Sequence, residues 1–448
     1  MVVTVKALCS ILLTALIFFV RSLLSDDHFA DVNSVSPVWP YTNWATAAVW
    51  IQEALDAAEP GDTVWVANGV YDVGGARPPT MLLKSRIAVT NSLVVRSVHG
   101  PEVTVIRGES DPQTGGCGPR AVRDVFMPKG LLIGFSITSG HTLTDGDVNL
   151  DRSGGGLFST GGTISNCWIQ GNCADLNGGG VYGGRLFNCV ISRNRAMVGG
   201  GVARSSLTDC VIAENETDLE HGAGGGTTIS TLVRCTVAGN VSRFAGGTSG
   251  GKLWSCIISN NTALLEGGGC ISEELYDCVI IGNRAGSFGG GVAEGRLERC
   301  VVVGNTAYHG GGALGADLIN CLVSQNIAED EGGGVYGGSL LHCTVVENTA
   351  AKRGGGTFGA MATNSIIYFN VAPAGANTFG GTLVHCCTVP LVPGIGNIFA
   401  DPLFVGRETR DWRLLPASPC IDRGYALPRS CFGGRDLMEI PRPLDGDG

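Results

Sequence analysis

A cysteine returns at steps of 21 to 25 residues through the middle of the chain, and an asparagine stands five residues after each one. Nine such pairs follow one another, and a tenth copy has Ser365 in the cysteine place with Asn370 after it. A fixed period of about 20–50 residues indicates a repeat architecture, in which each unit buries its apolar face against its neighbours. The cysteines are Cys167, Cys189, Cys210, Cys235, Cys256, Cys278, Cys300, Cys321 and Cys343. The asparagines are Asn172, Asn194, Asn215, Asn240, Asn261, Asn283, Asn305, Asn326, Asn348 and Asn370.

Glycine runs separate the apolar segments, as at residues 178–180 and 289–291. The Val- and Ile-rich stretches between them are too short for helices and predict short strands joined by tight corners. Parallel strands stacked about 4.8 Å apart place equivalent residues of successive units over one another. The sequence therefore predicts an all-β fold, a right-handed parallel β-helix solenoid of about ten coils with about 22 residues per coil.

The N-terminal region predicts a helical cap for this solenoid. Residues 44–58 are Ala-rich with one apolar face, Thr42 or Asn43 can cap the start, and Pro60-Gly61 ends the run. Residues 63–67 then read as a strand and residues 68–69 as a turn. A helix at this place would cover apolar core and strand edges that an open solenoid end exposes.

The first 25 residues predict an export signal, because Lys6 precedes an apolar run over residues 7–20 that Arg21 interrupts. An uncleaved N-terminal anchor is the alternative reading. With cleavage between residues 25 and 31, we expect a secreted or cell-surface protein whose mature chain has no transmembrane span. The predicted divisions are a signal (1–25), cap and first strand (26–75), irregular first coils (76–150), regular coils (151–389), and closing coil with tail (390–448).

Charge narrows the partners that the chain can have. The net charge is −10 and there is no basic tract, so nucleic acid is not expected as a partner. Charged residues make up only 16% of the chain, which fits a fold with much internal stacked surface. We expect a monomer.

The repeated cysteines stand beside Val and Ile, so we expect their side chains to point inward as small apolar fillers. Stacked coils leave the Cβ atoms slightly too far apart for a disulfide, which favours reduced thiols, although bridges stay open for an exported chain. There is no Cys-x2-Cys cluster, so no metal is predicted there. Five cysteines stand outside the repeat, and two of them, Cys420 and Cys431, suggest a small-loop disulfide. The five are Cys117, Cys173, Cys270, Cys420 and Cys431.

The repeated asparagines and glycines predict corners of the coil. Asn tolerates left-handed backbone angles, and stacked amides can bond from coil to coil. The glycine runs indicate positive φ or close approach between coils. Both sets are interpreted as structural ladders, in preference to ligand-binding or phosphate-binding roles.

Residues 41–71 (YTNWATAAVWIQEALDAAEPGDTVWVANGVY) resemble the cap and first strand of the bacterial right-handed parallel β-helix proteins of the pectate-lyase-like superfamily. Residues 399–424 resemble the closing coil of choice-of-anchor proteins, and the glycine repeats resemble those of polymorphic outer-membrane proteins. The resemblance implies fold and export but no particular reaction. Members that degrade polysaccharides use clustered carboxylates, often with Ca²⁺. Their R-x-P-x-x-R, W-x-D-H, N-T-D and G-H-G patterns are absent from this sequence.

Three successive coils carry a charged residue before the coil leucine, namely Glu274, Arg296 and Asp317. They predict a stacked row of alternating sign on one outer face, with Glu273 and Glu294 close by. One interpretation is a solvated salt-bridge ladder. The other is a carbohydrate groove or a Ca²⁺ site, so Ca²⁺ is the one cofactor considered.

A second acidic group comprises Glu329, Asp330 and Glu331, which fall in the same coil loop as Glu266 and His309 of earlier coils. The same two interpretations apply to it. All eight acidic and basic residues of the two groups are candidate ligand-binding residues, and no catalytic residue is assigned.

Three functions compete at this point. The first is a surface or secreted β-helix with a binding, adhesive or structural role, directed towards carbohydrate. The alternative is a polysaccharide lyase or glycoside hydrolase acting on a uronic-acid-rich polysaccharide, which irregular loops at residues 141–153 or 216–223 would favour by forming a cleft. An autotransported passenger is the third and would require a membrane barrel.

Overall fold

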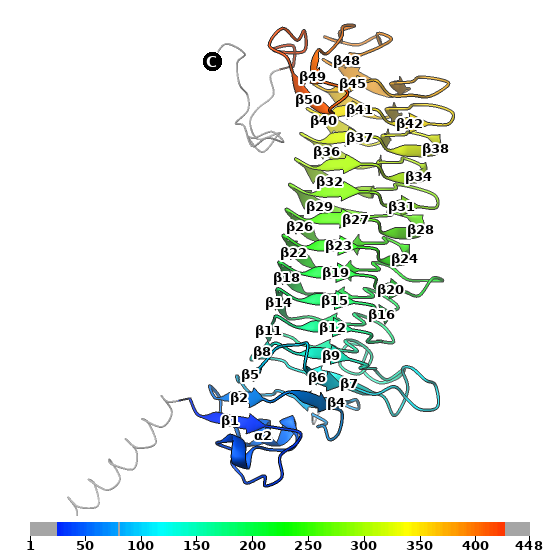
Figure 1. Ribbon diagram of the computed structural model, residues 1–448. Helices are drawn as coiled ribbons and strands as arrows, with labels where there is room; N and C mark the ends of the chain where they lie inside the picture. The colour runs from blue at the N-terminus through cyan, green and yellow to red at the C-terminus, as the bar shows by residue number, and fades with distance from the viewer. Residues whose placement is uncertain (1–24, 79–80, 426–448) are drawn as a thin grey trace, which may run out of the picture.

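The computed structural model, which describes residues 25–78 and 81–425, is a right-handed parallel β-helix of about 11 turns with about 22 residues per turn. Figure 1 shows the coils stacked into one rod, with the cap at its N-terminal end. The predicted fold class is therefore confirmed. The predictions that concern residues 1–24 and Cys431 lie outside the described residues. Within the described part, no helix is long and apolar enough to span a membrane.

One coil from the middle of the rod shows the plan. Strand β30 (Val279–Ile281) lies in a 14-stranded sheet, β31 (Arg284–Ala285) in an 8-stranded sheet, and β32 (Val292–Glu298) in a 26-stranded sheet. All three sheets are parallel and run along the rod. Most coils give the 26-stranded sheet two short strands with a bend between them, whereas β29 (Cys270–Tyr276) and β32 continue through the bend.

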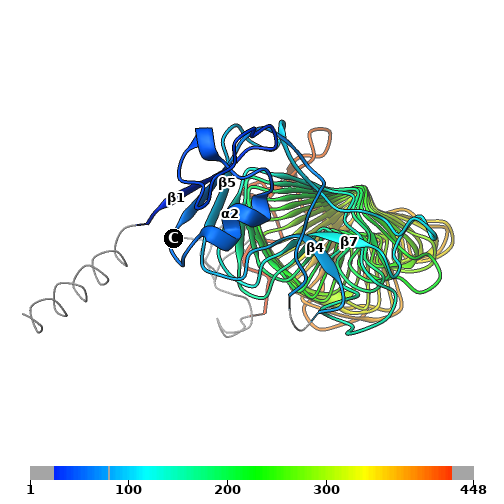
Figure 2. The same cartoon turned by 90° about the horizontal axis from the view of Figure 1, so that it is seen from below.

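The 14-stranded sheet runs from β3 (Gly69–Tyr71) to β48 (Cys387–Thr388), and the 8-stranded sheet from β16 (Arg195–Ala196) to β42 (Thr349–Ala350). A small antiparallel pair, β49 (Phe404–Gly406) and β50 (Asp411–Leu414), follows the last coil. The view along the rod in Figure 2 shows the coils superimposed on one another, which is why equivalent residues form continuous rows.

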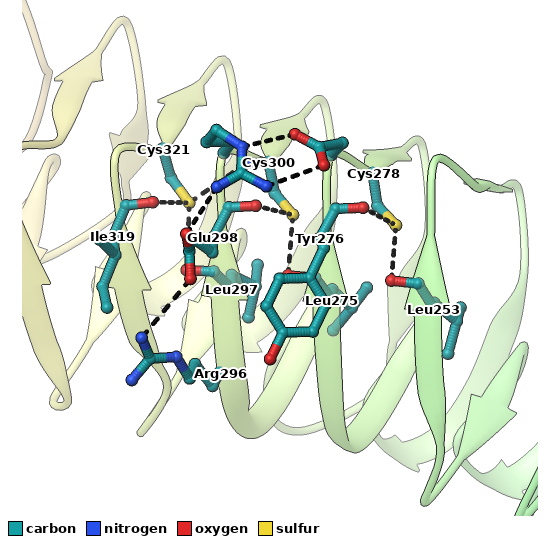
Figure 3. A network of polar contacts seen from close by, with 12 residues as sticks. Leu253, Leu275, Tyr276, Cys278, Arg296, Leu297, Glu298, Cys300, Ile319 and Cys321 are labelled. Carbon is teal, nitrogen blue, oxygen red and sulfur yellow. Dashed lines mark hydrogen bonds and ion pairs between the residues drawn. The ribbon is translucent and has the colours of Figure 1, made fainter. Parts of the chain in front are cut away.

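The cysteine row points inward, as predicted. All nine repeated cysteines are at most 2% exposed and pack with Leu, Ile and Val of neighbouring coils. Their sulfurs also make hydrogen bonds: Cys300 Sγ donates to the carbonyl of Leu275 at 3.5 Å (Figure 3). Cys256 N donates to Cys278 Sγ at 3.4 Å. Ser365 keeps this pattern, since its hydroxyl accepts from Cys343 N at 3.1 Å.

The asparagine row forms one continuous ladder of buried amides. Asn240 Nδ2 donates to Asn261 Oδ1 at 2.9 Å, and Asn261 Nδ2 donates in turn to Asn283 Oδ1 at 3.0 Å. Each amide also donates a hydrogen bond to a backbone carbonyl; for example, Asn261 Nδ2 donates to the carbonyl of Val237 at 3.0 Å. The coil-to-coil bonding expected from the sequence is therefore present.

The expectation that these asparagines take left-handed angles is wrong. The left-handed residue is the one before the asparagine, as at Arg193 (φ 55°) and Asn260 (φ 53°). The residue before each cysteine is left-handed as well, as at Asp277 (φ 56°). The ladder asparagine turns its side chain into the core, where the amide satisfies backbone groups that the sharp corner leaves unpaired.

The helical part of the cap is shorter than predicted. The 3-10 helix η1 (Trp44–Thr46) and the α-helix α2 (Ile51–Ala57) replace a single helix over residues 44–58. The predicted cap residue Asn43 accepts a bond from Thr46 N at 3.2 Å. The helix is interrupted because Ala48 N donates to the carbonyl of Phe29, pairing this segment with the edge of the first strand, β1 (Asp27–Ala30).

Candidate ligand pocket at the N-terminal cap

An open pocket of about 450 Å³ lies where the cap meets the first coils. Its volume falls in the range of about 300–1,000 Å³ that small-molecule sites occupy. The lining residues are Asp31, Asn33, Trp44, Ala67, Asn68, Val98 and His99. One aromatic ring, two amides, one carboxylate and one imidazole therefore share this pocket.

Three neighbouring strands bring these side chains together. Strands β1, β2 (Thr63–Val66) and β5 (Val94–Ser97) are parallel and in register, with Ala30 opposite Val66 and Val66 opposite Ser97. Each strand ends at the same level, so the residues that follow the three ends stack at one corner of the rod. The segment between β1 and α2 then folds back and adds the tryptophan and one of the amides.

Trp44 contributes an indole ring to the lining of the pocket. It is 43% exposed, and Phe29 holds it in place through an edge contact with ring centroids 4.6 Å apart. Asn43 fixes the start of η1, the short helix to which Trp44 belongs. The ring is thus supported by the cap on one side and open to the pocket.

The polar groups of the pocket are oriented by hydrogen bonds to one another. His99 Nδ1 and Asn68 Oδ1 share a hydrogen bond of 2.8 Å, which orients the imidazole and the amide relative to each other. One oxygen of Asp31 accepts from Asn33 N at 2.9 Å, and a carboxylate retains further acceptor capacity. No lysine or arginine lines the pocket, so its only full charge of fixed sign is the carboxylate of Asp31.

The predicted row of alternating charges exists, but each of its members is bonded to a polar or charged residue beside the row. Glu274 lies opposite Arg296, and Arg296 lies opposite Asp317, on the outer side of β29, β32 and the next strand, β36 (Asp317–Ile319). Lys252 Nζ approaches Glu274 Oε2 to 2.9 Å and thereby lowers the pKa of that carboxyl below its ordinary range. Asp317 accepts from the hydroxyl of Ser339 at 2.5 Å.

Figure 3 shows that further ion pairs lie beside this row. Glu298 is 6% exposed and contacts both Arg299, at 2.5 Å, and Arg296, at 3.5 Å. Arg299 also grips Asp277 with two bonds of 2.7 and 2.9 Å, which raises the pKa of Arg299 above its ordinary value. This face has the geometry of a salt-bridge ladder, in which protein charges already neutralise one another.

Glu273 does not lie on this face, contrary to the sequence-based expectation. Its side chain turns into the solenoid, where it is 2% exposed and Oε2 has no hydrogen-bond partner among the described residues. Burial raises the pKa of this carboxyl to about 8, although the hydroxyl of Thr248 and the N–H of Gly251 oppose the shift. Glu294 does remain outside, where it accepts from the hydroxyl of Ser272 at 3.3 Å.

The acidic loop likewise pairs with cations of neighbouring coils. Asp330 contacts Lys352 at 3.1 Å, Glu331 contacts Arg353, and Glu329 lies 3.8 Å from Arg284. His309 and Glu331 are register partners, so the predicted juxtaposition of coil loops is correct. Glu266 belongs to the same row, because it stands opposite Phe288, which in turn stands opposite His309. Among residues 25–78 and 81–425, no group of three or more His, Cys, Asp or Glu side chains is placed to hold a metal ion. Ca²⁺ binding stays a prediction.

The two irregular loops do not line the pocket. In the loop over residues 141–153, Asp151 Oδ1 accepts from the N–H groups of Leu82 and Leu83, both at 2.9 Å. The buried Arg123 donates to the carbonyls of Leu150 and Ser153. The loop over residues 216–223 closes a turn on the side chain of Asp218, since Oδ1 accepts from the N–H of Glu220 at 2.8 Å.

No protein-family model matches the sequence, and no curated protein matches it. Solved structures show likenesses of low identity. The A-module of the mannuronan C-5 epimerase AlgE4 of Azotobacter vinelandii is 15% identical over 83% of this chain and 100% of its own, with a TM-score of 0.38. Pectate lyase Pel9A is 12% identical over 94% and 97%, with a TM-score of 0.31. PfbA, a surface adhesin of Streptococcus pneumoniae, is 11% identical over 80% and 90%, with a TM-score of 0.26.

Sequence reasoning missed the pocket because its residues come from four separate segments. Trp44 counted as part of a helix, and residues 68–69 as a turn. The available signal was that residues 68–69 directly follow a predicted strand, while Trp44 opens the predicted cap that must fold back over the rod.

Proposed function

We propose that this protein is a carbohydrate-binding β-helix and that its cap pocket accepts one neutral sugar unit of a glycan. The observation that carries the proposal is the exposed ring of Trp44 facing an open pocket with four polar side chains. One face of a pyranose ring presents C–H groups, which the negative face of an indole attracts. The hydroxyls of a sugar both donate and accept, as the amides, the carboxylate and the imidazole of the pocket do.

The charge of the pocket favours a neutral sugar over a uronic acid. A uronate would bring its carboxylate towards Asp31 with no lysine or arginine in the lining to offset the repulsion. The charged rows elsewhere on the rod support the same choice of site, because their acidic members are engaged in ion pairs with nearby lysines and arginines.

We further propose a secreted or cell-surface location, in line with the role in binding or adhesion that the sequence suggests. This part of the proposal rests on the apolar N-terminal run over residues 7–20 alone.

The test is a glycan-array screen followed by titration of the best ligand. Trp44→Ala should weaken the apparent Kd at least tenfold, which corresponds to about 1.4 kcal/mol. Trp50→Ala is the matched control, because Trp50 belongs to the same cap, is also 43% exposed and does not line the pocket. Equal loss in both variants, or a preference for uronate-rich glycans, would contradict the proposal.

A degradation assay separates binding from catalysis. Folded protein is incubated with pectate, alginate and neutral polysaccharides, with and without Ca²⁺, while unsaturated products and new reducing ends are followed. The proposal expects no product. Product formation that persists in Trp44→Ala would overturn it in favour of a polysaccharide lyase or hydrolase acting elsewhere on the rod.

A further inference from the structure

Two cysteines outside the cysteine row meet near the surface of the first coils. Cys117 belongs to the loop between β6 (Thr104–Arg107) and β7 (Val122–Phe126), and Cys173 follows the first asparagine of the ladder. Their sulfurs are 3.6 Å apart, and both residues are partly exposed. They are separated by 56 positions in the sequence, so the contact joins the loop to the second coil beyond it.

The position of Cys173 shows that it is not a core filler. It stacks between His141 and Arg195, and the row continues with Glu216. This row comes directly after the asparagine ladder and points away from the core. A cysteine in a row of histidine, arginine and glutamate gains nothing from apolar packing, unlike the buried cysteines one corner earlier.

The surroundings of Cys117 favour its thiolate. The hydroxyl of Thr142 donates to Cys117 Sγ at 3.5 Å. The Cys173 thiol and this hydroxyl lower the pKa of Cys117 to about 7 despite its partial burial, whereas the same contact raises the pKa of Cys173. Cys117 is therefore the nucleophile of the pair near neutral pH.

We propose that Cys117 and Cys173 form a disulfide that staples the 108–121 loop to the solenoid. The Cys117 thiolate attacks an external disulfide, either a low-molecular-weight one or that of a thiol oxidoreductase, and displaces one thiolate. Cys173 loses its proton and attacks Cys117 Sγ, which displaces the second thiolate. Two cysteine thiols are oxidised, the external disulfide is reduced to two thiols, and the sulfurs close from contact to a bond of about 2.05 Å.

The repeated cysteines stay reduced under the same conditions. Each is at most 2% exposed, so an external disulfide cannot reach its sulfur. Each sulfur is also engaged with a backbone carbonyl, as Cys256 Sγ is with that of Trp254 at 3.3 Å. The repeated cysteines therefore serve as a control within the same chain, because they are neighbours but are not accessible to thiol–disulfide exchange.

Peptide mapping tests the staple directly. The full protein is equilibrated with oxidised glutathione, its free thiols are alkylated after denaturation, and trypsin digestion is followed by mass spectrometry without reduction. The expected product joins residues 108–120 to residues 153–185. Because the second peptide also contains Cys167, Cys167→Ser should keep the linked product, whereas Cys173→Ser should abolish it. Recovery of both Cys117 and Cys173 as alkylated thiols in the wild type overturns the proposal.

A second readout does not depend on the variants folding. Arg120 is exposed in the stapled loop, but Ala121 after it is buried, so cleavage between them requires the loop to leave the rod. Brief trypsin treatment of the oxidised native protein should cut at Arg120 at least tenfold more slowly than treatment of the reduced protein. Equal rates contradict a staple that holds the loop.

Discussion

Each buried asparagine amide of the ladder makes hydrogen bonds to two neighbouring coils. Asn261 is fully buried, and its Oδ1 accepts from both the backbone N–H and the side chain of Asn240. Its Nδ2 donates to Val237 O and to Asn283 Oδ1. Removing the amide leaves donors and acceptors of two neighbouring coils without partners and without water, and each such group costs about 1–3 kcal/mol.

Asn261→Ala should therefore lower the free energy of unfolding by about 3 kcal/mol or more. Urea unfolding followed by circular dichroism measures the change. Thr262→Ala, one residue later on the outer side of β28 (Thr262–Glu266), is the control and should change stability by less than about 0.5 kcal/mol. Similar midpoints for both variants would mean that the ladder contributes little.

Glu273 is a buried carboxyl at a position where the adjacent coils have glycine. The adjacent coils carry Gly251 and Gly295 at the place where Glu273 turns inward. Its folded-state pKa of about 8 lies above the ordinary 4.5, so the folded state retains a proton that the unfolded chain releases. The free energy of unfolding must then fall as pH rises from about 4.5 to about 8, by on the order of 1.4 kcal/mol per pH unit.

Glu273→Gln should remove this pH dependence. Its melting temperature relative to wild type is expected to rise from pH 5 to pH 8 and to stay level above pH 8. Differential scanning calorimetry in a series of buffers measures the difference. Glu274→Gln is the neighbouring control on the outer face, where Lys252 lowers the pKa, and it should show no such gain. Parallel profiles for Glu273→Gln and wild type would show that Glu273 does not titrate in this range.

At the level of the coil, the glycine runs set how closely successive turns approach. A Cβ on Gly290 would lie 2.4 Å from the carbonyl oxygens of Gly311 and Thr306 in the next coil. Gly304 is different, because its φ is +63° but a Cβ there would have no neighbour within 4 Å. Gly290 is required because a side chain there would clash with the next coil, whereas Gly304 is favoured only because of its left-handed backbone angle.

Gly290→Ala should consequently destabilise the protein by about 3 kcal/mol or more, since the clash involves backbone that cannot move without separating two coils. Gly304→Ala should cost only about 1–2 kcal/mol, the usual cost of a left-handed backbone with a side chain. Thermal melting of the two variants tests the order. A larger effect at Gly304 would contradict the close approach of coils seen at Gly290.

These elements also show what a sequence can and cannot specify. The repeat of cysteine, asparagine and glycine predicted the parallel solenoid and the inward cysteines, because stacked coils place equivalent residues in equivalent surroundings. It did not predict that Gly282 and Gly304, one residue before a ladder asparagine, take the left-handed angle. A corner can place this angle at either residue, and only hydrogen bonding across coils decides between them.

The candidate site was less predictable than the fold because it depends on the whole molecule. Sequence reasoning chose Glu274, Arg296 and Asp317 for their regular spacing, but the same stacking of coils places other polar and charged side chains beside them, which they bond. The cap pocket arises instead where the repeat is broken and separate segments meet. Asp31 and His99 gave no local signal, since they are brought together by the stacking of the first coils.

The cap covers the N-terminal end of the rod. Helix α2 packs Ile51, Ala54 and Leu55 onto the open end of the core, and the segment before it pairs with the edge of β1. Without this cover, apolar core and unpaired backbone groups would face solvent and promote end-to-end association.

Ile51→Asp places a charge in that buried contact and should loosen α2, lowering the melting temperature and producing dimers or longer assemblies in light scattering. Asp56→Ala, on the exposed side of the same helix, should stay as monodisperse as wild type. If Ile51→Asp melts earlier but does not associate, the helix stabilises the rod without protecting its end.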